Sequence, residues 1–120
     1  MSGSDVPRMV DYIDHIVEAI SRIIKYVEDI DEQAFVRDHM IQDAVIRNFE
    51  IIGEAARNVE KRYPEFADKH PEVPWAVAYE MRNVLAHGYF KVDLGVVWQT
   101  IMRDLPQLQA QVSRLRAELN

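Results

Sequence analysis

The sequence predicts an all-α protein: a bundle of four main helices that run up and down, with additional short helical turns. Three observations point to this class. Apolar residues recur every three or four positions over long stretches, which is the spacing of one face of an α-helix. Aspartates stand just before several of these stretches, where their side chains would cap helix N-termini. Glycine and proline are scarce, with 4 and 5 among 120 residues, so few long loops are expected.

The first helix is expected over residues 6–28, with Asp5 as its N-cap and Pro7 in its first turn. Its apolar stripe is unbroken and comprises Val6, Met9, Val10, Ile13, Ile16, Val17, Ile20, Ile23, Ile24 and Val27. Residues 29–32 interrupt the pattern, and Asp31 would cap a short helical turn that follows.

A second long helix is expected over residues 39–62, with Asp38 as its cap. Gly53 and the alanines after it predict a close approach by another helix, because small side chains let two backbones come near each other. Residues 64–74 contain three prolines and are expected to form a loop.

A third helix is expected over residues 75–87, and Gly88 is suited to a left-handed cap at its C-terminus. Asp93 would cap the last helix, over residues 94–119. Pro106 would kink or split that helix, because proline lacks the amide that the helical hydrogen bond needs.

Composition narrows the class of protein. We expect residues 1–120 to form one domain, with residues 1–4 flexible. The absence of cysteine excludes disulfides, thiolate metal sites and a cysteine nucleophile. Neither a membrane span nor a signal peptide is evident, so a cytoplasmic location is expected. The formal net charge of −6 argues against sequence-blind nucleic-acid binding, but it leaves room for a local phosphate site.

The segment 81–90, near the end of the third predicted helix, holds four side chains suited to chemistry on a phosphate: Arg82, Asn83, His87 and Tyr89. An arginine can hold a phosphate with a planar fork of donors. A histidine can transfer a proton near neutral pH. Asn83 and His87 are four residues apart, so they share a helix face and Asn83 could orient the histidine or the phosphate.

This set suggests metal-independent RNA cleavage. Arg82 would hold the scissile phosphate, and His87 would act as general base or general acid while the RNA's own 2′-hydroxyl attacks. One histidine supplies only one of the two proton transfers. A homodimer that brings two copies of the segment together would supply the second.

From spacing alone, a structural reading competes with the chemical one. A histidine at a helix C-terminus is favoured there simply as a cation beside backbone carbonyls, and His87 fits that role. The other histidines, His15, His39 and His70, lack metal-ligand spacing, so no metal site is expected. Glu54 is either a solvated helix residue or a buried acid that faces the segment, and the sequence leaves both open.

Residues 82–89 resemble the R-x-x-x-x-H-x-Y motif of the HepT-like toxins in the HEPN superfamily. The resemblance continues through further blocks in the same order, at residues 43–47, 51–56, 71–75, 92–93 and 97–98. It implies an all-α HEPN bundle that dimerises, with the motifs of both subunits lining one cleft.

The resemblance also implies roles. Arg82 and His87 would be catalytic, with Asn83 in support, and Tyr89 would be the site at which an MNT-type nucleotidyltransferase antitoxin transfers AMP from ATP. Arg47 and Glu54 match blocks with supporting roles at most. The implied protein is an endoribonuclease toxin of a type VII-like toxin–antitoxin system, with RNA as substrate and no cofactor.

Two readings from other classes stay open. The chain could be a non-catalytic partner of that nucleotidyltransferase, in which Arg82 binds the phosphate of a nucleotide or substrate and His87 transfers no proton. It could instead be a dimeric helical interaction module, in which changes to the motif leave every phenotype unaltered.

Overall fold

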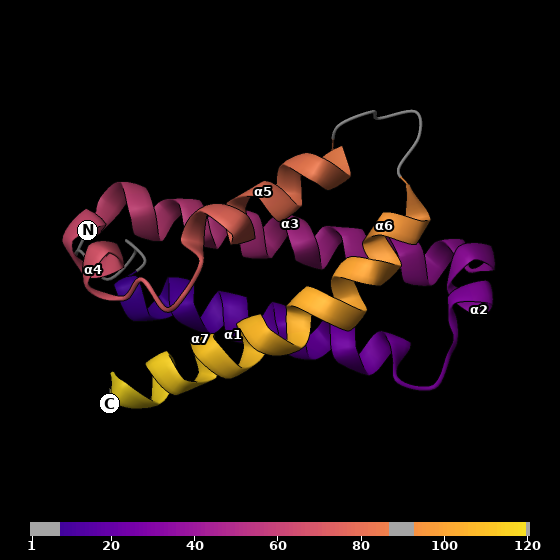
Figure 1. Cartoon of the computed structure of the whole chain (residues 1–120), viewed down its shortest axis with the longest axis horizontal. Coiled ribbons are helices and arrows are strands. Elements are labelled where there is room, and N and C mark those ends of the chain that lie inside the picture. The colour runs from indigo at the N-terminus through magenta and orange to yellow at the C-terminus, as the bar shows by residue number, and fades with distance from the viewer. Residues whose placement is uncertain (1–7, 87–92, 120) are drawn as a thin grey trace, which may run out of the picture.

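The computed structural model describes residues 8–86 and 93–119. Every regular element within these ranges is helical, and the bundle measures 45 × 27 × 25 Å (Figure 1). The longer helices are α1 (Met9–Val27), α3 (His39–Arg62), α5 (Trp75–Ala86) and α7 (Leu105–Glu118). The shorter elements are α2 (Glu32–Arg37), α4 (Pro64–Lys69), α6 (Leu94–Gln99) and η2 (Thr100–Asp104), a π-helical turn. The predicted all-α bundle with four main helices is confirmed.

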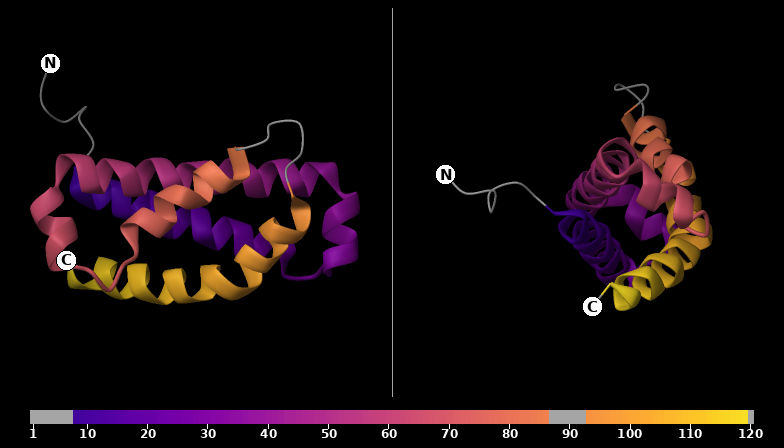
Figure 2. Two further views of the ribbon diagram at one scale, coloured as in Figure 1. Left: turned by 45° about the horizontal axis from the view of Figure 1, so that its top comes forward. Right: turned by 90° about the vertical axis from the view of Figure 1, so that its left-hand side faces the viewer.

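Helices α1 and α3 form the centre of the bundle. Helix α5 packs against α3, and α7 packs against α1, as the view along the bundle shows (Figure 2). The predicted apolar stripes supply the core, including Ile13, Ile16, Ile20 and Ile23 of α1, Val45, Phe49, Ile52 and Val59 of α3, and Leu105, Leu108, Val112 and Leu115 of α7. Gly53 and Ala56 are buried in α3, as expected for a helix with close neighbours.

Three predicted N-caps are present. The carboxylate of Asp31 accepts a hydrogen bond from the Ala34 amide (2.9 Å), that of Asp38 from the Ile41 amide (3.0 Å), and that of Asp93 from the Val96 amide (3.1 Å). Each cap satisfies an amide that the first turn of a helix leaves without a backbone partner.

The predicted start of the first helix is wrong. Helix α1 begins at Met9, because Arg8 has an extended backbone (φ −81°, ψ 166°) and serves as the N-cap in place of Asp5. The Asp11 carboxylate reaches back to accept a hydrogen bond from the Arg8 amide at 2.8 Å, which fixes the boundary there. Asp5, Pro7 and the N-terminal residues 1–4 lie outside the described residues.

The predicted loop over residues 64–74 is partly helical. Pro64 occupies the first position of α4, where a missing amide costs nothing. Glu65 in the first turn and Lys69 in the last turn complement the helix dipole. The connection without helix is therefore confined to residues 70–74, and it leads directly into α5.

Pro106 divides the last predicted helix, as expected. The amide of Leu105 donates to the carbonyl of Thr100, five residues back, so the chain passes through η2 before α7 begins. Proline has no amide to continue the α-helical pattern, which explains the change of register beside it.

None of the helices in the part of the chain that the structure describes is long and apolar enough to cross a membrane.

Candidate functional site

Helix α5 carries the first half of the motif and is anchored at its start. Trp75 is 5% exposed, and its indole Nε1–H donates to the carbonyl of His70 at 3.2 Å. The ring of Phe66 lies 4.5 Å from that of His70 and 6.4 Å from that of Trp75. Ala78, one turn further on, is also buried. The core therefore fixes the position and direction of α5.

The helical backbone of α5 continues to Ala86, so Arg82 and Asn83 lie within its last five residues. The predicted third helix is confirmed up to that point. His87, Gly88 and Tyr89 lie outside the described residues, so the structure leaves their placement, and the predicted cap, untested.

A polar contact joins α5 to α3 one turn before the motif. The Arg57 Nη1 donates to the Tyr79 hydroxyl at 3.0 Å, and the Arg57 guanidinium carbon lies 5.4 Å from the centroid of the Tyr79 ring. Arg57 is exposed and Tyr79 is half-buried. The pair places a planar cation at the surface directly beside the helix that carries Arg82.

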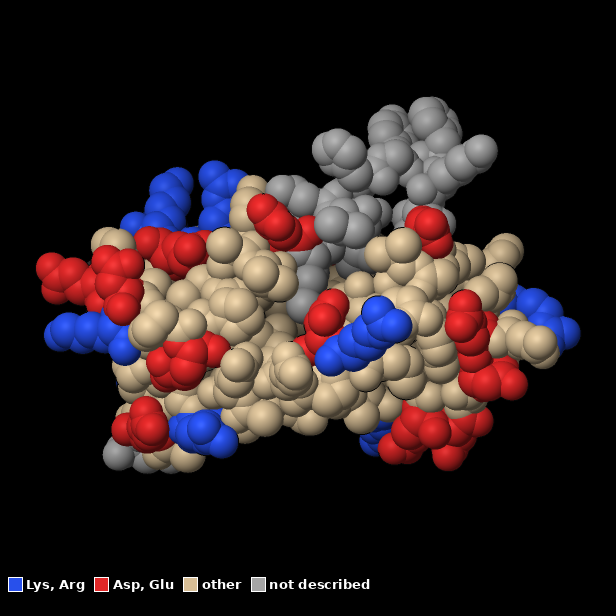
Figure 3. Space-filling model, viewed as in Figure 1, with Lys and Arg blue, Asp and Glu red and all other residues tan. Residues whose placement is uncertain are grey.

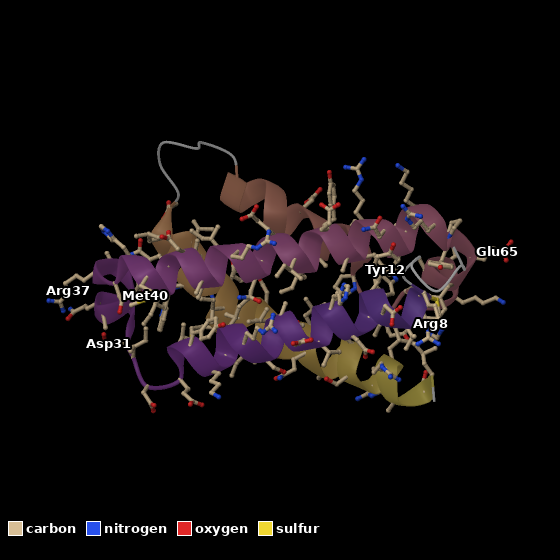
Figure 4. All side chains as sticks on the ribbon, turned by 180° about the vertical axis from the view of Figure 1, so that it is seen from behind. Arg8, Tyr12, Asp31, Arg37, Met40 and Glu65 are labelled. Carbon is tan, nitrogen blue, oxygen red and sulfur yellow. The ribbon has the colours of Figure 1, made fainter. Side chains whose placement is uncertain are left out.

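Arg47 and Glu54 lie together in a groove between α1 and α3. The groove has a volume of about 690 Å³, and it is lined by Tyr12, His15, Arg47, Glu50, Ile51, Glu54, Ala55, Asn58 and Arg62. Tyr12 is buried, and Figure 4 shows it between the two helices. Its ring meets His15 edge-on at 6.4 Å. The structure thus brings the two predicted supporting residues to one face of α3.

Glu54 is exposed. Of the two readings that the sequence left open, the buried acid is therefore wrong.

The turn that leads into α5 holds a histidine–carboxylate pair. His70 Nδ1 and Glu72 Oε2 are 3.0 Å apart. A hydrogen bond from its own backbone amide, followed by the one to His70, holds the pKa of Glu72 below the usual glutamate value of 4.5. The charged carboxylate therefore stabilises this turn at neutral pH.

Charges of both signs are interspersed on the face shown in Figure 3, around a broad area of other residues. Among the residues that the structure describes, no three His, Asp or Glu side chains are grouped as metal ligands. Apart from the residues drawn in grey, this face shows no extended basic field of the kind that sequence-blind nucleic-acid binding uses.

Two features of the site could not be predicted from the sequence. Tyr79 could have been placed one turn before Arg82 by counting, but its contact with Arg57 depends on how α3 and α5 are aligned. The groove between α1 and α3 likewise depends on the pairing of two helices. Among the residues that line the groove, only Arg47 and Glu54 were indicated by the sequence, because they lie in blocks that recur in the family.

A protein-family model and several known proteins match this chain. A family model described as "Ribonuclease HepT-like" matches residues 16–115. A Thermococcus cleftensis protein named "Probable ribonuclease HepT" is 42% identical over 106 residues, which cover 88% of this chain and 94% of that protein. A Caldanaerobacter subterraneus protein named "Putative RNase" is 38% identical over 104 residues, which cover 87% of this chain and 90% of that protein.

A longer relative also matches. A Methanocaldococcus jannaschii protein named "Gamma-glutamylcyclotransferase and putative RNase" is 40% identical over 109 residues, which cover 91% of this chain. The match spans 48%, or about half, of that protein's own length. No solved structure matches the chain significantly.

In the part of the chain that the structure describes, the fold is an all-α helical bundle. Since the family model covers most of the chain and several relatives exceed 30% identity over most of their length, the chain belongs to the HepT-like ribonuclease family.

Proposed function

We propose that this chain is a metal-independent endoribonuclease that acts as a homodimer, with Arg82 and His87 as catalytic residues and Asn83 in support. The observation that carries the proposal is the R-x-x-x-x-H-x-Y motif, whose arginine stands at the end of a helix anchored in the core. Membership of the HepT-like ribonuclease family supports RNA as the substrate. The proposal treats residues 1–120 as one catalytic domain.

In the proposed reaction the RNA supplies its own nucleophile. The 2′-oxygen forms a bond to phosphorus, and the bond from phosphorus to the 5′-oxygen breaks. One proton leaves the 2′-hydroxyl and one joins the 5′-oxygen, which yields a 2′,3′-cyclic phosphate and a 5′-hydroxyl. Arg82 would stabilise the charge that develops on the phosphate oxygens.

His87 follows Ala86, the last described residue of α5, directly in the sequence. Arg82 would offer the phosphate a positive charge and a planar fork of donors. The two histidines of a dimer would act as the general base and the general acid.

Tyr89 is the proposed regulatory site. A nucleotidyltransferase would join the Tyr89 oxygen to the α-phosphorus of ATP, and pyrophosphate would leave as the bond between the α- and β-phosphates breaks. The AMP group would add bulk and a negative charge two residues from His87. The chain would then be the toxin of a type VII-like toxin–antitoxin system.

The proposal is tested with unmodified protein, confirmed by intact mass, and a fluorescent RNA in buffer with EDTA. Wild type should cleave the RNA, and His87→Ala and Arg82→Ala should each lose about 100-fold or more in kcat. Arg22→Ala is a matched control, because it also removes an exposed arginine, and Arg22 lies on α1 rather than on α5, the helix that carries Arg82.

The proposal fails if unmodified wild type leaves RNA intact or if both motif variants cleave as well as Arg22→Ala. Binding of ATP without cleavage would instead support the non-catalytic nucleotide-binding partner.

A further inference from the structure

The contact between Arg57 and Tyr79 holds an arginine side chain at the surface beside α5. Tyr79 holds the arginine in two ways, through the 3.0 Å hydrogen bond to its hydroxyl and through its ring beneath the guanidinium. A guanidinium held in this way keeps an exposed flat face that a nucleobase can stack on. Because Tyr79 already restrains Arg57, less side-chain entropy is lost when a ligand binds.

The pair lies one helical turn from the proposed catalytic residues. Tyr79 precedes Arg82 by three residues and Asn83 by four in the continuous helix α5, which corresponds to about 4.5 to 6 Å along the axis. This distance is comparable to the step between neighbouring nucleotides in a single strand. From a scissile phosphate at Arg82, one such step reaches the neighbouring phosphate, which links a flanking nucleotide to the one beyond it. Arg57 would therefore lie beside that further nucleotide.

Local charge allows contact with a single strand but does not favour indiscriminate binding. Lys61 is exposed and follows Arg57 by four residues, so both cations lie on one face of α3 about one turn apart. Glu60 follows Arg57 by three residues, and Glu80 directly follows Tyr79, so acidic residues are also close in the sequence. A subsite here must therefore draw its affinity from stacking and a local phosphate contact rather than from a broad positive field.

We propose that Arg57, supported by Tyr79, forms an RNA subsite. It holds the nucleotide one step beyond the two that flank the scissile phosphate, with the base stacked on the guanidinium and Lys61 near the adjoining phosphate. This inference rests on the proposed ribonuclease function and adds a determinant of substrate length to it.

The test compares a dinucleotide, which lacks the extra nucleotide, with a hexanucleotide, which has it. Arg57→Gln removes the flat cation, Arg57→Lys keeps only the charge, and Tyr79→Phe keeps only the ring. The hexanucleotide KM should rise about tenfold or more in Arg57→Gln, with a smaller rise in the other two variants. The loss in kcat/KM should be several times greater for the hexanucleotide than for the dinucleotide.

An abasic nucleotide placed at each position of the hexanucleotide identifies the base that stacks. One abasic position should weaken cleavage by wild type and have much less effect on Arg57→Gln, because that variant has already lost the stacking partner. Arg22→Gln serves as the control, since it also removes an exposed arginine that donates one hydrogen bond.

Several outcomes overturn the subsite. If Arg57→Gln loses kcat/KM equally on the dinucleotide and the hexanucleotide, and its Tm is lower, then the Arg57–Tyr79 pair only stabilises the packing of α3 against α5. If Arg57→Gln cleaves both substrates with the same kcat/KM as Arg22→Gln, the proposed subsite is contradicted.

Failure of the proposed function can be distinguished from failure of the subsite. If wild type cleaves no RNA, the anisotropy of a labelled hexanucleotide still reports binding. Weaker binding in Arg57→Gln than in Arg22→Gln would then support the subsite although the cleavage proposal has failed, whereas equal binding would overturn both.

Discussion

His70 and Glu72 show how two neighbouring side chains stabilise the turn before α5. The pKa of Glu72 is lower in the folded chain than in the unfolded one, so its charged form stabilises the fold above about pH 4.5. That contribution disappears as the pH falls through the lowered pKa of the folded state.

His70→Asn should raise the pKa of Glu72 but leave it below 4.5, because the larger cause, the bond from its own amide, remains. A carbon-detected NMR titration of the Glu72 carboxyl measures this, with His39→Asn as the control. An unchanged pKa in His70→Asn would show that the histidine has no part in the shift.

Phe35 and Met40 are both apolar and lie five positions apart, but they differ in burial. Phe35 is fully buried, with its ring 5.5 Å from that of Trp98, whereas Met40 is 79% exposed at the α2 end of the bundle (Figure 4). Phe35→Ala should lower the free energy of unfolding by about 3–5 kcal/mol, and Met40→Ala should change it by less than about 0.5 kcal/mol. Urea denaturation measures both, and similar losses would contradict this placement of the core.

At the scale of the helix, the N-caps mark where elements begin. Asp38 caps α3 through the Ile41 amide, while Asp43 is exposed one turn later in the same helix. Asp38→Ala should therefore destabilise the protein by about 1 kcal/mol, and Asp43→Ala should cost much less. If the two variants unfold at the same urea concentration, the cap bond makes no net contribution.

Helix positions were predictable wherever a local signal was strong. Asp31, Asp38 and Asp93 marked true N-termini because a capping carboxylate acts within three residues. The sequence predicts too early a start for the first helix, since Asp5 and Pro7 also fit a helix N-terminus, and the Arg8–Asp11 contact decides the boundary. It predicts a loop where α4 forms, because three prolines indicate a loop, although Pro64 suits a first helical position.

The candidate site was predictable only in part. The sequence predicts that the helix that carries Arg82 and Asn83 begins at residue 75, directly after the segment 64–74 with its three prolines, and the structure confirms that start. The contact between Arg57 and Tyr79 could not be predicted, because it depends on the relative alignment of α3 and α5. Burial of Glu54 was likewise undetermined, since the edge of an amphipathic stripe does not say where a neighbouring helix ends.

At the scale of the whole molecule, two chains are proposed to form one RNA-cleaving site. Each chain offers a single motif histidine, whereas the proposed reaction needs two proton transfers. A dimer with only one His87 should then be inactive, even though its other subunit is wild type.

Titration of wild type with His87→Ala tests this claim most directly. The two proteins are unfolded together, refolded at fixed total concentration and assayed for RNA cleavage. If both histidines are required in each dimer, activity should fall as the square of the wild-type fraction, to about a quarter at equal amounts. A linear fall to about half, or no cleavage by unmodified wild type at all, would contradict the account.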